Sequence, residues 1–222
     1  MDDIIYIRAD TKRNGFTTML IGIIGLSLSL AWLAWLPPVM KLAGIFLTSA
    51  SLVAILIGWF KIREPAYSVA LTKEKLRYEH RKGQWQLDWT NIQRVDIPRV
   101  SRGLEQQDLA MVGIRIKHYE PLLETISPRL ASNILMQQRA LLLQDSCKTG
   151  QCYSENLVEG ETFKGENGRQ YRGIQAMFAN RMRRTREILG YDLFIDVAEL
   201  DRPATDFVNL LRACQQQAVV SA

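Results

Sequence analysis

The chain has 222 residues, a net charge of +5 and a mean hydropathy of −0.08. This length leaves room for one ordinary domain beside a membrane segment, since domains hold roughly 100–150 residues. The small positive charge is a weak signal for nucleic-acid binding. Three cysteines without a repeated spacing exclude a disulfide framework and indicate reduced thiols in a cytoplasmic domain: Cys147, Cys152 and Cys214.

Two uncharged apolar runs, Phe16–Leu36 and Leu42–Phe60, follow a short N-terminal segment over residues 1–15. Each run is about long enough to cross the ~30 Å hydrocarbon core of a bilayer as a helix. The connection between them is short and carries Pro37 and Pro38, so we expect an antiparallel transmembrane hairpin over residues 16–60. The runs lack the charged side chains that a transporter or proton relay needs at depth. The hairpin therefore reads as an anchor.

The orientation of this hairpin follows from the basic residues at its ends. Basic side chains flank the outer ends of both runs, whereas the connection holds a single Lys41; the flanking residues are Arg8, Lys12, Arg13, Lys61 and Arg63. Cytoplasmic loops carry the excess of Lys and Arg. We therefore predict a multi-pass protein of the inner (cytoplasmic) membrane with both termini in the cytoplasm.

The chain from residue 65 to residue 222 predicts one α+β domain. Alternating apolar residues between Tyr67 and Lys117 indicate about five short antiparallel strands, with Val100–Asp108 as a polar loop. Ser127-Pro128 predicts the start of a helix, and Asn167-Gly168 a tight turn in a glycine-rich loop. A second helix from Ile174, a strand over residues 191–197 and a final helix from Asp201 follow.

Two stretches carry a resemblance to a known fold. Residues 67–83 (YSVALTKEKLRYEHRKG) with Trp89–Val95 (WTNIQRV) resemble the opening of bacterial pleckstrin-homology-like (PH-like) domains, and residues 191–196 (YDLFID) with the helix 201–214 are similar to the last strand and capping helix. The resemblance implies a PH-like antiparallel β domain with a C-terminal capping helix behind the membrane hairpin. Residues 119–190 depart from this pattern as a helical insertion. The whole chain resembles a gammaproteobacterial family of two-pass membrane proteins, a domain of unknown function.

The residues suited to catalysis or metal binding do not form a recognisable pattern. His80 and His118 are the only histidines, and neither has a cysteine or histidine at ligand spacing. The loop over residues 160–173 lacks the Gly-Lys-Ser/Thr ending of a phosphate-binding loop. We therefore expect no catalytic residue, no cofactor and no metal ion.

Arg181, Arg183, Arg184 and Arg186 form the strongest local cluster of charge. Basic side chains near the C-terminal end of a helix suit its dipole, so these four can simply form a solvated face. On a domain held at a membrane they can instead contact anionic headgroups or a protein partner. No aromatic residues interleave with them for base stacking, which disfavours nucleic acid.

The leading hypothesis is a non-catalytic, two-pass membrane-anchored protein whose cytoplasmic PH-like domain is an interaction or scaffold module for a protein partner. One alternative is a sensor of anionic lipid headgroups that uses the basic helix. A third is an enzyme with a site in the loop over residues 147–173.

Overall fold

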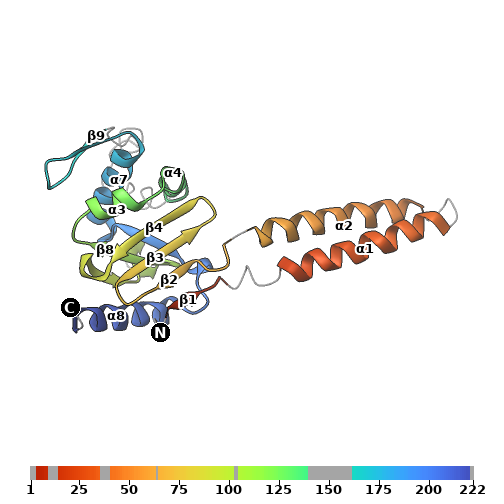
Figure 1. The fold of residues 1–222 in the computed structure, drawn as a ribbon, viewed down its shortest axis with the longest axis horizontal. Coiled ribbons are helices and arrows are strands. Elements are labelled where there is room, and N and C mark those ends of the chain that lie inside the picture. The colour runs from red at the N-terminus through yellow and green to blue at the C-terminus, as the bar shows by residue number, and fades with distance from the viewer. Residues whose placement is uncertain are drawn as a thin grey trace. The chain divides into compact units, whose positions relative to one another are not determined.

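The computed structural model describes residues 4–9, 15–35, 41–63, 65–102, 105–139 and 162–220. The chain divides into two compact units (Figure 1). One unit is residues 9–66, which hold two long helices. The other combines residues 1–8 with residues 67–222 and holds the antiparallel sheets.

The first unit is a pair of packed apolar helices, α1 (Gly15–Trp35) and α2 (Lys41–Ile62), each long and apolar enough to cross a membrane. Small residues face the partner helix: Gly15, Gly22, Ser29, Gly44, Ser51 and Gly58 are buried. A Cβ atom on Gly58 would lie 2.6 Å from the backbone nitrogen of Met19, so the close approach of the two backbones requires glycine there. The predicted pair of packed helices is confirmed.

The larger unit begins with a four-stranded antiparallel sheet in the order β1-β2-β3-β4. Its strands are β1 (Ile5–Ile7), β2 (Val69–Leu71), β3 (Lys75–His80) and β4 (Gly83–Asp88). Ile7 pairs with Val69 and is fully buried. Residues 5–7 of the N-terminal segment therefore belong to this sheet. The two long helices are therefore inserted between neighbouring strands.

A second antiparallel sheet has the order β11-β8-β5. It contains β5 (Ile92–Asp96), β8 (Met111–Ile116) and β11 (Leu193–Asp196), and a separate hairpin is made of β6 (Arg99–Arg102) and β7 (Glu105–Asp108). The prediction of a loop over residues 100–108 was wrong, because this hairpin pairs strands that lack the apolar alternation by which a strand is recognised.

The remaining elements are mostly helical. They are α3 (Glu120–Thr125), α4 (Pro128–Gln137), α7 (Ile174–Leu189) and α8 (Ala204–Val220), the hairpin β9 (Thr162–Lys164)–β10 (Gln170–Arg172), and 3-10 turns at Trp89–Asn91 and Val197–Glu199. The Ser127 side chain accepts from Leu130 N and caps α4, as predicted. Gly168 turns the β9–β10 hairpin with φ +75°, which confirms the predicted tight turn.

One hydrophobic core joins both sheets to α3, α4, α7 and α8. Trp85, Leu87 and Trp89, which alternate with polar residues in the sequence, are all buried in it. On α8, Arg212 donates to the carbonyl of Val95, and other side chains of the helix enter the core. The α+β prediction is confirmed: a pair of long apolar helices, then antiparallel sheets with helices, then a C-terminal helix.

Candidate functional site

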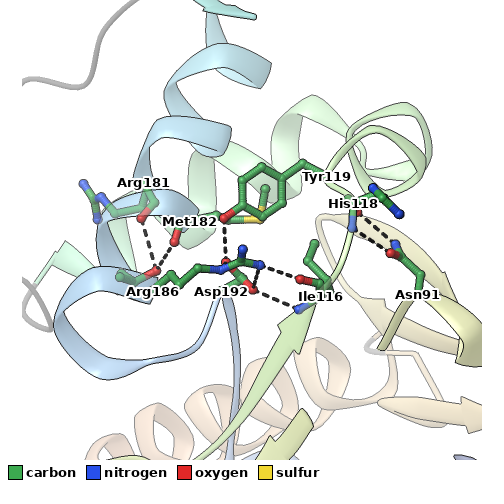
Figure 2. A network of polar contacts seen from close by, with 9 residues as sticks. Asn91, Ile116, His118, Tyr119, Arg181, Met182, Arg186 and Asp192 are labelled. Atoms are coloured by element: carbon green, nitrogen blue, oxygen red, sulfur yellow. Dashed lines mark hydrogen bonds and ion pairs between the residues drawn. The ribbon is translucent and has the colours of Figure 1, made fainter. Parts of the chain in front are cut away.

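A buried polar network holds α7 to the second sheet (Figure 2). The Asp192 side chain is fully buried and accepts hydrogen bonds from Ile116 N (2.9 Å), Tyr119 Oη (2.8 Å), Arg186 Nε (2.7 Å) and Arg186 Nη2 (2.6 Å). Arg186 also donates to the Ile116 carbonyl. The charges of Asp192 and Arg186 are therefore paired with each other inside the domain. Their hydrogen bonds to Ile116 and Tyr119 fix the chain between β8 and α3.

The network shifts the titration of its members. Burial, followed by the negative charge of Asp192, raises the pKa of Tyr119 well above its ordinary value. Burial lowers the pKa of Arg186, but the hydrogen bond and charge of Asp192 outweigh it and the pKa is raised. Tyr119 stays a hydrogen-bond donor and Arg186 a cation at physiological pH, as a structural clamp requires.

The four arginines proposed for lipid or partner contact do not share one exposed face. Arg181 is buried at 4% exposure and donates to the Leu135 carbonyl, and Arg186 is engaged with Asp192. Arg183 is exposed and Arg184 is half-buried. Arg181 lies on the side of α7 that also buries Phe178, three residues earlier. The helical spacing between the two residues therefore indicates that Arg181 is buried. Lipid or partner contact remains a prediction for Arg183 and Arg184.

A groove of about 360 Å³ lies between α4 and β11 in the larger unit. Trp85 and Leu193 are its buried walls. Amide and carboxylate side chains lie beside aromatic and aliphatic ones in the full lining, which is Tyr78, Trp85, Met111, Leu130, Asn133, Ile134, Gln137, Gln138, Leu193, Phe194, Asp196, Ala198 and Glu199. These residues come from both sheets, from α4 and its C-cap, and from the 3-10 turn after β11, so no single sequence pattern marks the groove.

The backbone of β11 borders this groove. The strand pairs with β8 along one edge, and at its other edge the Phe194 carbonyl accepts a hydrogen bond from the Gln138 side chain at 3.3 Å. That amide stands where the N–H of a further strand would donate. The main-chain groups at the unpaired edge of a sheet are a template for pairing with an extended chain.

The groove carries negative charge. Its described lining includes the carboxylates of Asp196 and Glu199 and no basic side chain, although Lys82 bonds to Asn133 at its border. Tyr78 Oη donates to Glu199 at 2.5 Å and so links β3 to the 3-10 turn that follows β11. Burial, and then the charge of Glu199, raises the pKa of Tyr78 far above its ordinary value. Tyr78 therefore keeps its proton and stays a hydrogen-bond donor to Glu199.

His118 lies beside two carboxylates, that of Glu120, two residues further along the chain, and that of Glu166, which is distant in the sequence. One ligand atom each from His118, Glu120 and Glu166 lies within 4.8 Å of the others. Glu166 comes from the β9–β10 turn, which explains why ligand spacing in the sequence gave no signal. His80 lies elsewhere, stacked beside Tyr78 with ring centres 6.3 Å apart. Cys147 and Cys152, and the first part of the proposed enzyme loop, lie outside the described residues.

Comparison with known proteins identifies a family. No curated protein and no solved structure matches this chain. A family model described as a protein of unknown function (DUF2982) matches residues 69–217. The match begins at β2 and ends within α8, so it includes every described strand except β1, together with the groove and the Asp192 network. Because the match covers most of its length, the chain belongs to the DUF2982 family.

Proposed function

We propose that this protein is a non-catalytic, two-pass inner-membrane protein whose cytoplasmic PH-like domain is an interaction module. The observation that carries the proposal is the groove beside β11, an acidic and partly aromatic surface at a sheet edge. The Asp192 network supports a non-catalytic role, because its hydrogen bonds are made within the domain and serve its packing.

The pairing of β1 with β2 supports the two-span topology. β1 precedes α1 and β2 follows α2, and the two strands are hydrogen-bonded neighbours. A chain that crosses a bilayer twice returns to the side it left, so both strands can join one sheet only on that side. The basic residues flanking the helices favour the cytoplasm for it.

The order of elements supports the PH-like resemblance. A meander of β2, β3 and β4 precedes the sheet of β5, β8 and β11, and α8 closes the chain. The hairpin β6–β7 and the elements between β8 and β11 are additions to this pattern. We also propose, on the resemblance of the whole chain, that the protein is similar to gammaproteobacterial two-pass membrane proteins.

The occupant of the groove is an extended peptide segment of a partner protein with a basic residue between apolar ones. The edge of β11 would pair with its backbone. Asp196 and Glu199 would pair with its basic side chain, and Trp85 and Phe194 would contact its apolar residues. The volume of about 360 Å³ fits a few side chains, not a folded surface.

Thiol labelling in whole cells tests the topology. Lys41→Cys, at the start of α2, should react with a membrane-impermeant reagent from the periplasm. Arg8→Cys, beside β1, should react only after the cells are opened. The reverse pattern would place the domain outside the cytoplasm, and equal labelling of both in intact cells would remove the two-span hairpin.

Site-specific photo-crosslinking tests the groove. Gln137 and Met136 are consecutive exposed residues of α4, and only Gln137 lines the groove. A photo-reactive residue at position 137 should link to one peptide segment of a partner, and the same residue at position 136 should not. A synthetic copy of that segment should bind the purified full chain, more weakly at high salt. Equal crosslinks from both positions, or a synthetic segment that does not bind, would refute this use of the groove.

A further inference from the structure

We propose that His118, Glu120 and Glu166 form a binding site for a divalent first-row metal ion of the Zn²⁺ or Mn²⁺ type. The inference is independent of the proposed interaction function, and it departs from the expectation of no metal drawn from the sequence. Three segments contribute: His118 lies in the connection from β8 to α3, Glu120 is the first residue of α3, and Glu166 lies in the β9–β10 turn.

The donor atoms are already gathered. His118 Nδ1 lies 2.7 Å from Glu166 Oε2, and a carboxylate oxygen of Glu120 completes a set of three within 4.8 Å of one another. One imidazole and two carboxylates suit Zn²⁺ and Mn²⁺, which accept nitrogen and oxygen ligands. The side chains of His118 and Glu166 are 59% and 68% exposed, so an ion can enter and keep water on its remaining positions.

The observation that supports a cation here is the buried carboxylate of Glu120. Glu120 is buried at 8% exposure, and within the described residues no Lys, Arg or His pairs with it in an ion pair. Two other arginines form ion pairs elsewhere: Arg169 with Glu124 and Arg186 with Asp192, each at 2.6 Å. Burying a carboxylate without an opposite charge is costly. The exposed carboxylate of Glu166 places a second negative charge beside it, and a divalent ion between the two would offset both charges.

The ligands are held in place by the surrounding fold. The backbone of His118 is fixed on both sides by the Asn91 amide, which accepts from His118 N at 2.8 Å and donates to His118 O at 2.9 Å (Figure 2). Glu166 N donates to Glu120 Oε1 at 2.6 Å. A Cβ atom on Gly165 would lie 2.6 Å from the same oxygen, so glycine lets the turn approach the carboxylate. Such preorganisation favours metal binding, because little is left to order.

Cobalt titration of the full chain in detergent, after chelator treatment, tests the site. Co²⁺ is the probe because its spectrum separates nitrogen and oxygen ligands from thiolates, which give strong near-ultraviolet charge-transfer bands. We expect one equivalent to bind without such bands, and Zn²⁺ to displace it. His118→Ala and Glu166→Gln should weaken binding at least about 10-fold, since ligand changes exceed the roughly 10–100-fold effect of their supporting partners. The matched control His80→Ala should bind as the wild type does.

Hydrogen exchange gives a readout that does not depend on the spectrum. Zn²⁺ should slow exchange of the β9–β10 amides in the wild-type chain and leave Glu166→Gln unchanged, because binding to the folded state stabilises the elements it joins. Glu166 is exposed, so this variant should fold normally. No saturable binding, binding that all three variants retain, or a spectrum of thiolate ligation alone would overturn the proposal.

Discussion

Asp192→Ala should be among the most destabilising single substitutions in the sheet-containing unit. The change removes a fully buried carboxylate and leaves the Arg186 guanidinium without its counter-ion and Tyr119 Oη without its acceptor. Removing one partner of a buried pair costs about 3–5 kcal/mol. Because the Arg186 side chain keeps 26% exposure, water recovers part of that loss. We expect a decrease of about 3–4 kcal/mol in the free energy of unfolding.

Urea unfolding of the full chain in detergent, followed by hydrogen exchange in β8 and β11, measures this loss. With a slope of about 1–3 kcal/mol per molar urea, the midpoint should fall by roughly 1–4 M. Asp108→Ala is the matched control: it breaks the Arg99–Asp108 pair, whose side chains are 66% and 58% exposed, and should cost less than about 1 kcal/mol.

The double variant Asp192→Ala/Arg186→Met sharpens the test. If the loss comes from an uncompensated buried charge, removing the guanidinium as well should restore part of the stability. A loss for Asp192→Ala no larger than that of Asp108→Ala would refute the reasoning. A double variant that is less stable than Asp192→Ala would show that Arg186 contributes through packing instead.

Three further outcomes follow from the fold. Ile7→Ala should cost about 2–5 kcal/mol in urea unfolding because it empties a fully buried site, whereas the 38% exposed Ile5→Ala should cost far less; equal effects would remove β1 from the core. Gly58→Leu should separate α1 from α2 and lower the thermal midpoint in detergent, whereas Ala50→Leu at an exposed helix position should not; an unchanged Gly58→Leu midpoint contradicts the packing. The side-chain hydrogen bond from the adjacent arginine lowers the pKa of Asp201, so its contribution to stability is present above the ordinary pKa of 3.8 and is lost as the pH falls below it. Asp201→Asn should therefore have a lower free energy of unfolding than the wild type at pH 7. In unfolding measured at decreasing pH this difference should shrink, and a difference that grows would contradict the assignment.

The sequence predicted the elements whose cause is local. The two apolar runs predicted α1 and α2, because exposing so many consecutive apolar side chains to water is unfavourable. Ser127 predicted the start of α4, because its side chain caps the first turn of that helix. The alternation at Trp85 and Leu87 revealed β4 because one face of that strand is buried. In each case the deciding residues lie within a few positions of one another.

Features that depend on residues far apart in the chain could not be predicted from the sequence. The pairing of β1 with β2 could not be predicted from the sequence, because β2 lies beyond both long helices. The groove joins Tyr78, Asn133 and Phe194 from three separate parts of the chain. Among the arginines of α7, a count of charges favoured one basic face, whereas the apolar residues at helical spacing from Arg181 would have placed it inward.

The insertion of both long helices between β1 and β2 sets an order on the protein's synthesis. Ile5–Ile7 leaves the ribosome first, and its partner Val69–Leu71 appears only after residues 8–68 have been made. On the proposed topology, an error that leaves α2 outside the bilayer would deliver β2 to the opposite side from β1, and the first sheet could not close. Completion of that sheet, with Ile7 buried in it, would thus report to the cell that both helices had inserted correctly.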